Sequence, residues 1–244
     1  MMRKIFFLLS LIIGIANPNL SYSQNKFAVV ELFTSQGDIN SPEADKLLSE
    51  LNKQSADGVY CISLHVDFWN RFGWKDPFSS LKHTRRLTNY SSVAKERETY
   101  TPYFVVNGVP VASNQVKQEV NKQLSIQRPV TLDINYQLFD DTLDIGYTLT
   151  GIEKTKKQVS SYYLNVVVLE KPMDTKVTAG DNKGKTLHNE NVALLFHTAN
   201  IGGNKGITRI PMRRFGKSAG RRMVVFVQDK QTKKVVAAQL VTYE

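Results

Sequence analysis

The sequence predicts an α/β fold in the first half of the chain and an all-β fold in the second half. In the first half, long apolar runs alternate with amphipathic stretches whose apolar residues recur every three or four positions. In the second half, apolar and polar residues alternate in short runs that turn residues separate, which is typical of antiparallel strands. We place the boundary near Arg128-Pro129, between domains spanning residues 24–128 and 129–244.

The first predicted strand is KFAVVELFT (26–34), which is apolar on both faces, as a central parallel strand should be. A predicted helix follows over SPEADKLLSELNKQ, with four apolar residues on one face: Ala44, Leu47, Leu48 and Leu51. We expect Ser41 to be its N-cap, with Pro42 at the first helical position, where proline is tolerated.

Four more elements complete the first half. VYCISLHVDF (59–68) is a second predicted strand, and a helical stretch follows over residues 79–98. YFVVNGVPVA (103–112) predicts a hairpin that turns at Asn107-Gly108, and Ser113 is the expected cap of a last helix. The resulting order, β-α-β-α-β-β-α, is that of a thioredoxin-like domain, so we expect the first two strands to be parallel.

The second half predicts a small antiparallel β-sandwich. Two alternating runs flank Asp140-Asp141, namely PVTLDINYQLF and DTLDIGYTLTG. Four more runs also have the composition of strands: SYYLNVVVLEK, ITRIPMRRF, RMVVFVQDK and KVVAAQLVTYE. AGDNKGKT (179–186) nearly matches a phosphate-binding loop, but that loop needs a parallel strand before it, so we interpret the segment as a turn or loop.

The N-terminus predicts a signal peptide over residues 1–23. Arg3 and Lys4 precede the apolar run IFFLLSLIIGIA, which is too short to span a bilayer comfortably, and cleavage is expected after Ser23. An N-terminal membrane anchor is the alternative. We therefore expect an exported protein, periplasmic or extracellular, that does not span the membrane once the signal is removed.

The charge of the chain is strongly basic. Without Arg3 and Lys4, 30 of the 32 basic residues remain against 22 acidic residues, a net charge of +8. An exported protein seldom meets nucleic acid, so anionic envelope polymers or lipid headgroups are the candidate partners of a basic surface. The basic run RIPMRRFGKSAGRR (209–222) could bind such a polymer or simply form a solvated face.

The single cysteine limits the redox chemistry. Cys61 is the one cysteine of the chain, so neither an internal disulfide nor a two-cysteine exchange cycle is possible. It lies in the middle of a predicted strand, where a free cysteine is expected to be buried and inert.

Three segments should meet at one end of the predicted sheet, where ligands gather in α/β proteins: SQGDINSP, HVDFWNRFGWKDPF and YTP. We expect the Thr101-Pro102 bond to be cis, from its position in the element order, with an ordinary trans proline as the alternative. His65 and Asp67 share one strand face and precede Trp69, which could make a ligand pocket. The favoured alternative is a small local core, with His65 hydrogen-bonded and Asp67 capping a turn.

The motifs ELFTSQG, HVDFWNRFGWKDPFSS, YTPYFVVNG and GDNKGKTLHNENV occur in this order. Together they resemble a family of secreted, thioredoxin-like bacterial proteins of unknown function. The resemblance implies a Cys-x-x-Cys-Pro pattern after ELFTSQG. Here Asp38 and Ser41 occupy the two cysteine positions, while Pro42 remains. This departure argues against carrying over a redox role.

The residues at these positions support binding better than catalysis. Asp38 keeps a negative charge near a helix N-terminus and Ser41 keeps a hydroxyl, but neither can exchange disulfides. A serine nucleophile needs a base, and His65 is the one local candidate, so we do not expect a hydrolase. A metal site from Asp38, His65 and Asp67 lacks the usual ligand spacing. We predict no catalytic residue, metal or cofactor.

The sequence therefore predicts an exported protein of the cell envelope, without a catalytic dithiol, that binds a ligand or an extended peptide. The predicted binding residues are Asp38, Ser41, Asp67, Trp69, Thr101 and Pro102. The alternative is a thiol-disulfide protein that acts through Cys61 and the thiol of a partner.

Overall fold

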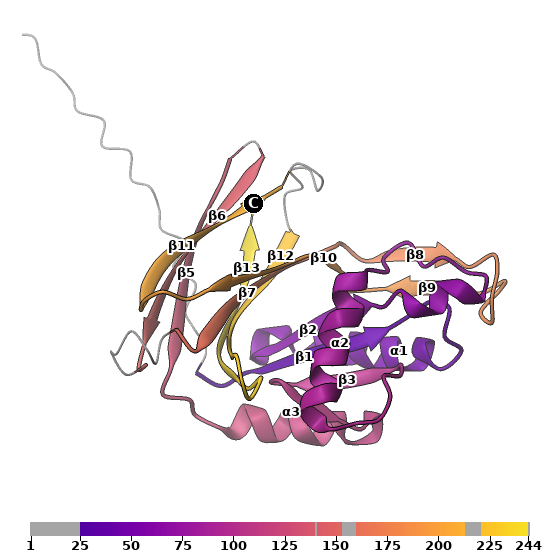
Figure 1. The fold of residues 1–244 in the computed structure, drawn as a ribbon, viewed down its shortest axis with the longest axis horizontal. Coiled ribbons are helices and arrows are strands. Elements are labelled where there is room, and N and C mark those ends of the chain that lie inside the picture. The colour runs from indigo at the N-terminus through magenta and orange to yellow at the C-terminus, as the bar shows by residue number, and fades with distance from the viewer. Residues whose placement is uncertain (1–24, 140, 153–159, 213–220, 244) are drawn as a thin grey trace, which may run out of the picture.

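The computed structural model describes residues 25–139, 141–152, 160–212 and 221–243. The predicted signal peptide, one residue of the Asp140-Asp141 turn and the middle of the basic run 209–222 lie outside these residues. The described chain mixes α and β structure, with strands predominating and arranged in several sheets (Figure 1). Within these four ranges, no helix has the length and apolar character needed to cross a membrane.

The first sheet has the strand order β2-β1-β3-β4. β1 (Ala28–Thr34) pairs in parallel with β2 (Val59–His65), which confirms the predicted parallel pairing. β3 (Tyr103–Val106) pairs antiparallel with β1 on the other side, and β4 (Val109–Val111) pairs with β3. Every residue of β1 and β2 is buried, which explains why their sequences are nearly continuous apolar runs.

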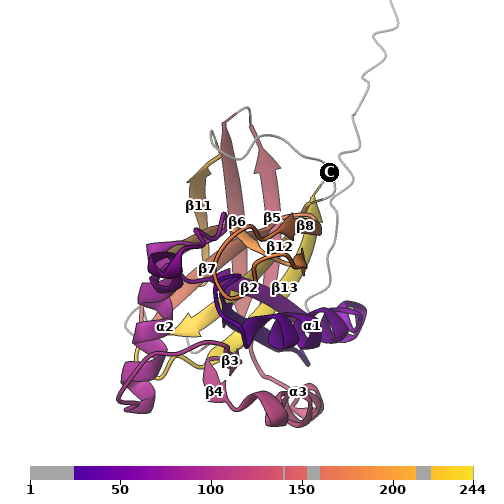
Figure 2. The ribbon, with the colours of Figure 1, turned by 90° about the vertical axis from the view of Figure 1, so that its right-hand side faces the viewer.

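Helices cover both faces of this sheet (Figures 1 and 2). α1 (Ser41–Asn52) and α3 (Val116–Ser125) share a core with one face, and α2 (Leu81–Ala94) packs on the other. Short 3-10 turns join the elements: η1 (Ser55–Asp57), η2 (Phe68–Phe72) and η3 (Ser113–Gln115).

Two predicted helix caps are wrong. The N-cap of α1 is Asn40, and Ser41 is the first helical residue. The Ser41 hydroxyl is engaged elsewhere, because it contacts Asp38 and the backbone of Ser35. Ser113 begins η3 instead of capping α3, and the N-cap of α3 is Gln115.

The predicted hairpin between β3 and β4 is confirmed. Asn107 has φ 47° and Gly108 has φ 82°, so both central residues adopt the left-handed conformation that a two-residue hairpin turn requires. Asparagine and glycine are the residues that adopt this conformation at least cost, which is why the Asn-Gly pair marked the turn in the sequence.

In the part of the second half that the structure describes, every regular element is a strand. One sheet has the order β10-β7-β12-β13, a second has the order β11-β6-β5, and β8 pairs with β9. The bounds are β5 (Thr131–Leu138), β6 (Thr142–Thr150), β7 (Tyr162–Leu169), β8 (Met173–Lys176), β9 (Thr186–Asn189), β10 (Ala193–Asn200), β11 (Lys205–Pro211), β12 (Arg221–Asp229) and β13 (Val235–Tyr243). The sequence did not predict β8, β9 or β10.

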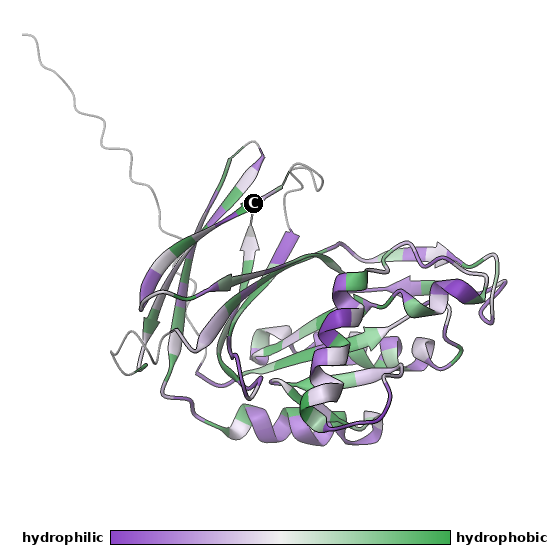
Figure 3. Cartoon of the chain, in the orientation of Figure 1, coloured by the Kyte–Doolittle hydropathy of each residue, from purple (hydrophilic) through white to green (hydrophobic). Residues whose placement is uncertain are grey.

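The two central strands of the sheet β10-β7-β12-β13, β7 and β12, are buried on both faces along most of their length. Along β7, Val166 and Val168 face the sheet β11-β6-β5, whereas Val167 faces the first sheet and shares a core with Val29 and Ile62. The two halves of the chain therefore share one apolar core across the predicted boundary. Figure 3 shows hydrophobic residues on the central strands of both halves and mainly hydrophilic residues on α3.

Candidate functional site

The three predicted segments do meet at one end of the first sheet. Thr34, at the end of β1, lies opposite His65, at the end of β2, and Phe33 lies opposite Tyr103, at the start of β3. The loops that leave or enter these strand ends are therefore neighbours, as the element order predicted.

Four predicted site residues form one chain of hydrogen bonds. Trp69 Nε1 donates to Thr101 Oγ1 at 2.7 Å, and the Thr101 hydroxyl donates to Asp38 Oδ2 at 2.7 Å. The Ser41 hydroxyl donates to the same oxygen at 2.8 Å, and the Asn40 backbone N–H donates to Asp38 Oδ1 at 3.0 Å. Asp38 is thus the acceptor that joins all three segments.

Thr101-Pro102 is a cis peptide bond, as predicted. Pro102 is half-buried beside Thr101, whose side chain is part of the hydrogen-bond chain. Asp67 is not part of the hydrogen-bond chain, because its carboxylate accepts a hydrogen bond from Thr84 Oγ1 on α2 at 2.6 Å.

The hydrogen-bond chain is internal. Asp38 and Ser41 have no exposed surface, so neither side chain is positioned to contact a ligand directly. The Ser41 hydroxyl is also without a histidine partner among the described residues, because it donates to Asp38 Oδ2 and accepts from the Ser35 N–H, while His65 Nδ1 is bonded to Asp76. The arrangement holds the loops in place and does not present a nucleophile.

Apolar side chains are exposed around this internal chain. We call Ile39, Trp69, Phe72 and Tyr100 the apolar rim. Ile39 is 49% exposed, while Phe72 and Tyr100 are each 53% exposed, and Trp69 is half-buried. The Trp69 and Phe72 ring centroids are 5.4 Å apart. Ile39 and Tyr100 are the chain neighbours of Asp38 and Thr101, so the rim follows the residues that the hydrogen bonds connect.

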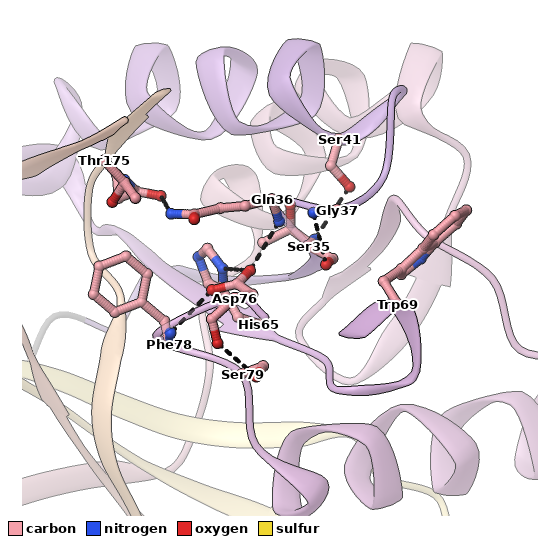
Figure 4. Close-up of polar contacts among 12 residues, drawn as sticks. Ser35, Gln36, Gly37, Ser41, His65, Trp69, Asp76, Phe78, Ser79 and Thr175 are labelled. Carbon is pink, nitrogen blue, oxygen red and sulfur yellow. Dashed lines mark hydrogen bonds and ion pairs between the residues drawn. The ribbon is translucent and has the colours of Figure 1, made fainter. Parts of the chain in front are cut away.

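A second buried polar cluster surrounds Asp76 (Figure 4). Asp76 Oδ2 accepts from His65 Nδ1 at 2.7 Å and from the Gln36 backbone N–H at 2.8 Å, and Oδ1 accepts from the Phe78 N–H at 2.9 Å. Figure 4 shows that the Trp69 ring points away from this cluster. The structure thus separates His65, which is held by a carboxylate, from the rim.

His65 and Asp76 shift each other's pKa, because their charges attract. Burial alone would lower the pKa of His65, but the charge and hydrogen bond of Asp76 outweigh it and raise that pKa. Burial likewise acts to raise the pKa of Asp76, but His65 and the two backbone N–H groups lower it. Both groups therefore favour the charged state, as a buried ion pair.

Asp45 is a third carboxylate near these groups. Its Oδ2 accepts from Thr34 Oγ1 at 3.1 Å. Burial raises the pKa of Asp45 to about 6, and the nearby carboxylates of Asp76 and Asp38 add to the effect, while His65 opposes it. Burial thus brings the pKa of the Asp45 carboxyl closer to neutral pH.

The second half of the chain closes the site from one side. Asn182 Nδ2 donates to the carbonyl oxygens of Gln36 at 3.0 Å and Asp38 at 2.9 Å, and Gln36 Nε2 donates to Asn189 Oδ1 at 2.9 Å. The AGDNKGKT segment is thus a loop between β8 and β9, which are antiparallel. It packs against the candidate site, and it lacks the parallel strand of a phosphate loop.

Sequence reasoning missed Asp76, Gln36, Asn182 and Asn189 as members of the site. All four lie in the motifs that carry the family resemblance, which was the available signal. Their contacts join segments up to 153 residues apart, and no local pattern indicates such pairs.

The other candidate residues from the sequence, Cys61, His188 and His197, lie in surroundings that suit a structural role. Cys61 is buried in β2, and burial raises the pKa of its thiol. His188 contacts Asp174 at 2.7 Å, and His197 contacts Thr208 at 3.0 Å. Across the described ranges, no three side chains among His, Cys, Asp and Glu form a group that could hold a metal ion, and Asp38, His65 and Asp67 do not converge.

A family model described as "Protein of unknown function (DUF1223)" matches residues 29–228. The chain belongs to this family. The matched range covers the loops of the candidate site and most of the second half, so the family includes both parts of the structure. A comparison with curated proteins found no match.

One solved structure is similar over nearly the whole chain. It is the X-ray crystal structure of protein AGR_C_4864 from Agrobacterium tumefaciens, with a TM-score of 0.66 and 21% sequence identity. The match covers 90% of this chain and 96% of that one. At this identity the likeness shows that the DUF1223 chain shares the fold of that protein.

Proposed function

We propose that this chain is an exported, thioredoxin-like protein without redox chemistry that binds an extended peptide at its apolar rim. The strand order β2-β1-β3-β4, with one parallel and one antiparallel neighbour for β1, supports the thioredoxin-like assignment of the first half. Two sheets packed around a common core support a β-sandwich in the second half. The basic start and apolar run of residues 1–23 support export.

The observation that carries the proposal is the contrast between the buried Asp38 chain and the exposed rim. At the two cysteine positions of the family pattern, Asp38 and Ser41 make internal hydrogen bonds that hold the three loops together. The side chains left at the surface there are large and apolar, which favours a binding surface over a reaction centre. Prior ordering of the loops lowers the entropic cost of binding.

The alternative function, thiol exchange through Cys61, finds little support. A nucleophilic thiol needs exposure and a lowered pKa, whereas Cys61 is 2% exposed and burial raises its pKa.

The proposal is tested with reduced, carboxymethylated α-lactalbumin, an unfolded polypeptide, as the probe of extended-peptide binding. We expect residues 24–244 to bind it saturably. The Phe72→Ser/Tyr100→Ser variant should bind roughly tenfold more weakly or worse, because it removes two exposed aromatic contacts.

The matched control is Val93→Ser/Ile207→Ser, which removes two exposed apolar side chains elsewhere on the molecule, 48% and 74% exposed. It should bind as the unmodified chain does. Equal weakening in both variants would indicate non-specific adhesion. An absence of saturable binding by the unmodified chain would contradict the proposal.

A further inference from the structure

A separate cavity of about 390 Å³ lies between α2 and the sheet β10-β7-β12-β13. Its walls come from α2, from the strands β7, β10 and β12, and from the turn before β13. None of the rim residues lines it. Its volume is at the small end of the range for sites that take organic ligands.

The inner wall of the cavity is a cluster of polar side chains that hydrogen-bond to one another. The Arg86 guanidinium pairs with the buried carboxylate of Glu31 and donates to Gln228 Oε1 at 3.1 Å. Tyr90 donates its hydroxyl to Glu31 and accepts from Gln228 Nε2 at 2.8 Å. Because Glu31 neutralises Arg86, this wall carries no net charge and is held rigidly.

Aromatic rings form the apolar part of the lining. Phe196 lies beneath the Arg86 guanidinium, 4.5 Å from the ring centroid, and is half-buried. Tyr163 on β7 is half-buried as well. Each ring already has a cation over one face, Arg86 over Phe196 and Lys230 Nζ 4.8 Å from the Tyr163 centroid, so an organic group would contact the ring surface that remains.

Three cations stand at the cavity without acidic partners. Lys82 and Arg85 are exposed on the first two turns of α2. Lys233 is half-buried in the turn before β13, where its Nζ donates to the Lys230 carbonyl oxygen at 2.7 Å. Among the described residues, none of the three forms an ion pair, and no residue lining the cavity is acidic. His83 adds no charge at neutral pH, because burial lowers its pKa to about 4.

We propose that this cavity binds a small organic anion. Its negative group would pair with Lys82, Arg85 and Lys233, and its apolar portion would rest against Phe196 and Tyr163. The arrangement places unpaired positive charge beside an apolar, hydrogen-bonded interior, which suits a ligand with one charged end.

A matched pair of fluorescent probes tests the charge requirement. Dansylglycine carries a carboxylate, whereas dansylamide has the same ring system without the charge. We expect residues 24–244 to bind dansylglycine saturably and more tightly than dansylamide, with an affinity that falls as salt is added. Equal affinity for the two probes, or no saturable binding of dansylglycine, would overturn the proposal.

Variants that remove charge test whether dansylglycine binds in this cavity. Lys82→Gln/Arg85→Gln should weaken dansylglycine binding about fivefold or more, since two charges near the carboxylate are lost. The control Lys53→Gln/Arg97→Gln removes the same charge from exposed positions outside the cavity and should bind normally. Equal weakening in both variants would overturn the assignment.

The rim variant Phe72→Ser/Tyr100→Ser separates this site from the proposed peptide site. It should leave dansylglycine affinity unchanged, since neither residue lines the cavity. Loss of binding in that variant would show that the probe occupies the rim and would overturn the proposal for the cavity, whatever the peptide experiment shows.

Discussion

Individual buried carboxylates organise the loops of this protein, and their partners differ. Asp38 accepts from two neutral hydroxyl groups and a backbone N–H, whereas Asp76 pairs with His65 and accepts from two backbone N–H groups. A buried carboxylate costs less free energy when each oxygen accepts hydrogen bonds. At the residue scale, the site is therefore stabilised by internal polar contacts.

The raised pKa of Asp45 predicts that the free energy of unfolding depends on pH. Its pKa in the folded chain is about 6, above the usual 3.8, so the folded state holds this proton more tightly than the unfolded state. Stability should thus fall as pH rises from about 4 to 6, by roughly 2–3 kcal/mol in total, and stay lowered above that range. Asp45→Asn removes this cost, so we expect it to raise the free energy of unfolding at pH 8 relative to its effect at pH 4.

Urea unfolding of both proteins at pH 4 and pH 8 measures this difference. Asp133→Asn is the matched control, because Asp133 is exposed on β5, and it should show little difference between the two pH values. If Asp45→Asn changes the free energy of unfolding equally at both pH values, its carboxyl does not have a raised pKa.

At the scale of elements, the β3–β4 hairpin turn connects the two halves. Asn107 Oδ1 accepts from the Val29 N–H at 2.8 Å, and the Asn107 carbonyl accepts from the Val235 N–H at 3.1 Å. Gly108 packs against the turn before β13, where an added Cβ would lie 1.7 Å from the Lys233 carbonyl oxygen. The turn thus needs glycine at position 108 for two reasons: its φ is 82°, and there is no space for a Cβ atom beside Lys233.

Gly108→Ala should lower the free energy of unfolding by more than about 3 kcal/mol, because backbone atoms must move to admit the methyl group. Gly184→Ala is the matched control. Gly184 also has a positive φ, 86°, but an added Cβ meets nothing within 4 Å, so its cost should be about 1 kcal/mol. Urea denaturation measures both, and equal losses would show that the contact with Lys233 is unimportant.

At the scale of the whole molecule, the two halves share a core instead of touching at a polar interface. Val167, Val224 and Phe226 from the second half pack with Val29 and Ile62 from the first. Separating the halves would expose this apolar face to water, which is unfavourable in proportion to its area. The predicted boundary near Arg128-Pro129 falls between α3 and β5, but it does not divide the core.

The shared core predicts a single cooperative unfolding transition. Trp69 and Trp74, the two tryptophans of the chain, lie in the first half, while most strands lie in the second. Tryptophan fluorescence and far-UV circular dichroism should therefore report the same urea midpoint. Two separated midpoints would show that the halves unfold independently.

The sequence by itself determined the features that depend on local chemistry. The helical stripe of α1, the Asn107-Gly108 turn and the continuous apolar runs of β1 and β2 follow from side-chain periodicity and backbone preference. The element order also predicted that the Asp38, Trp69 and Thr101 segments would meet. The sequence did not predict β10, because its residues, ALLFHTAN, do not alternate clearly between apolar and polar and are mostly half-buried.

Only the tertiary structure decided which groups bond across the chain. Asp38 accepts a hydrogen bond from Thr101, Asp67 accepts one from Thr84, and His65 pairs with Asp76. The cavity beside Lys82 and Lys233 likewise exists because α2 and β12 approach from distant parts of the chain. A hydrogen bond or an ion pair depends on distances of a few ångströms, and local sequence patterns carry no information about such distances between remote segments.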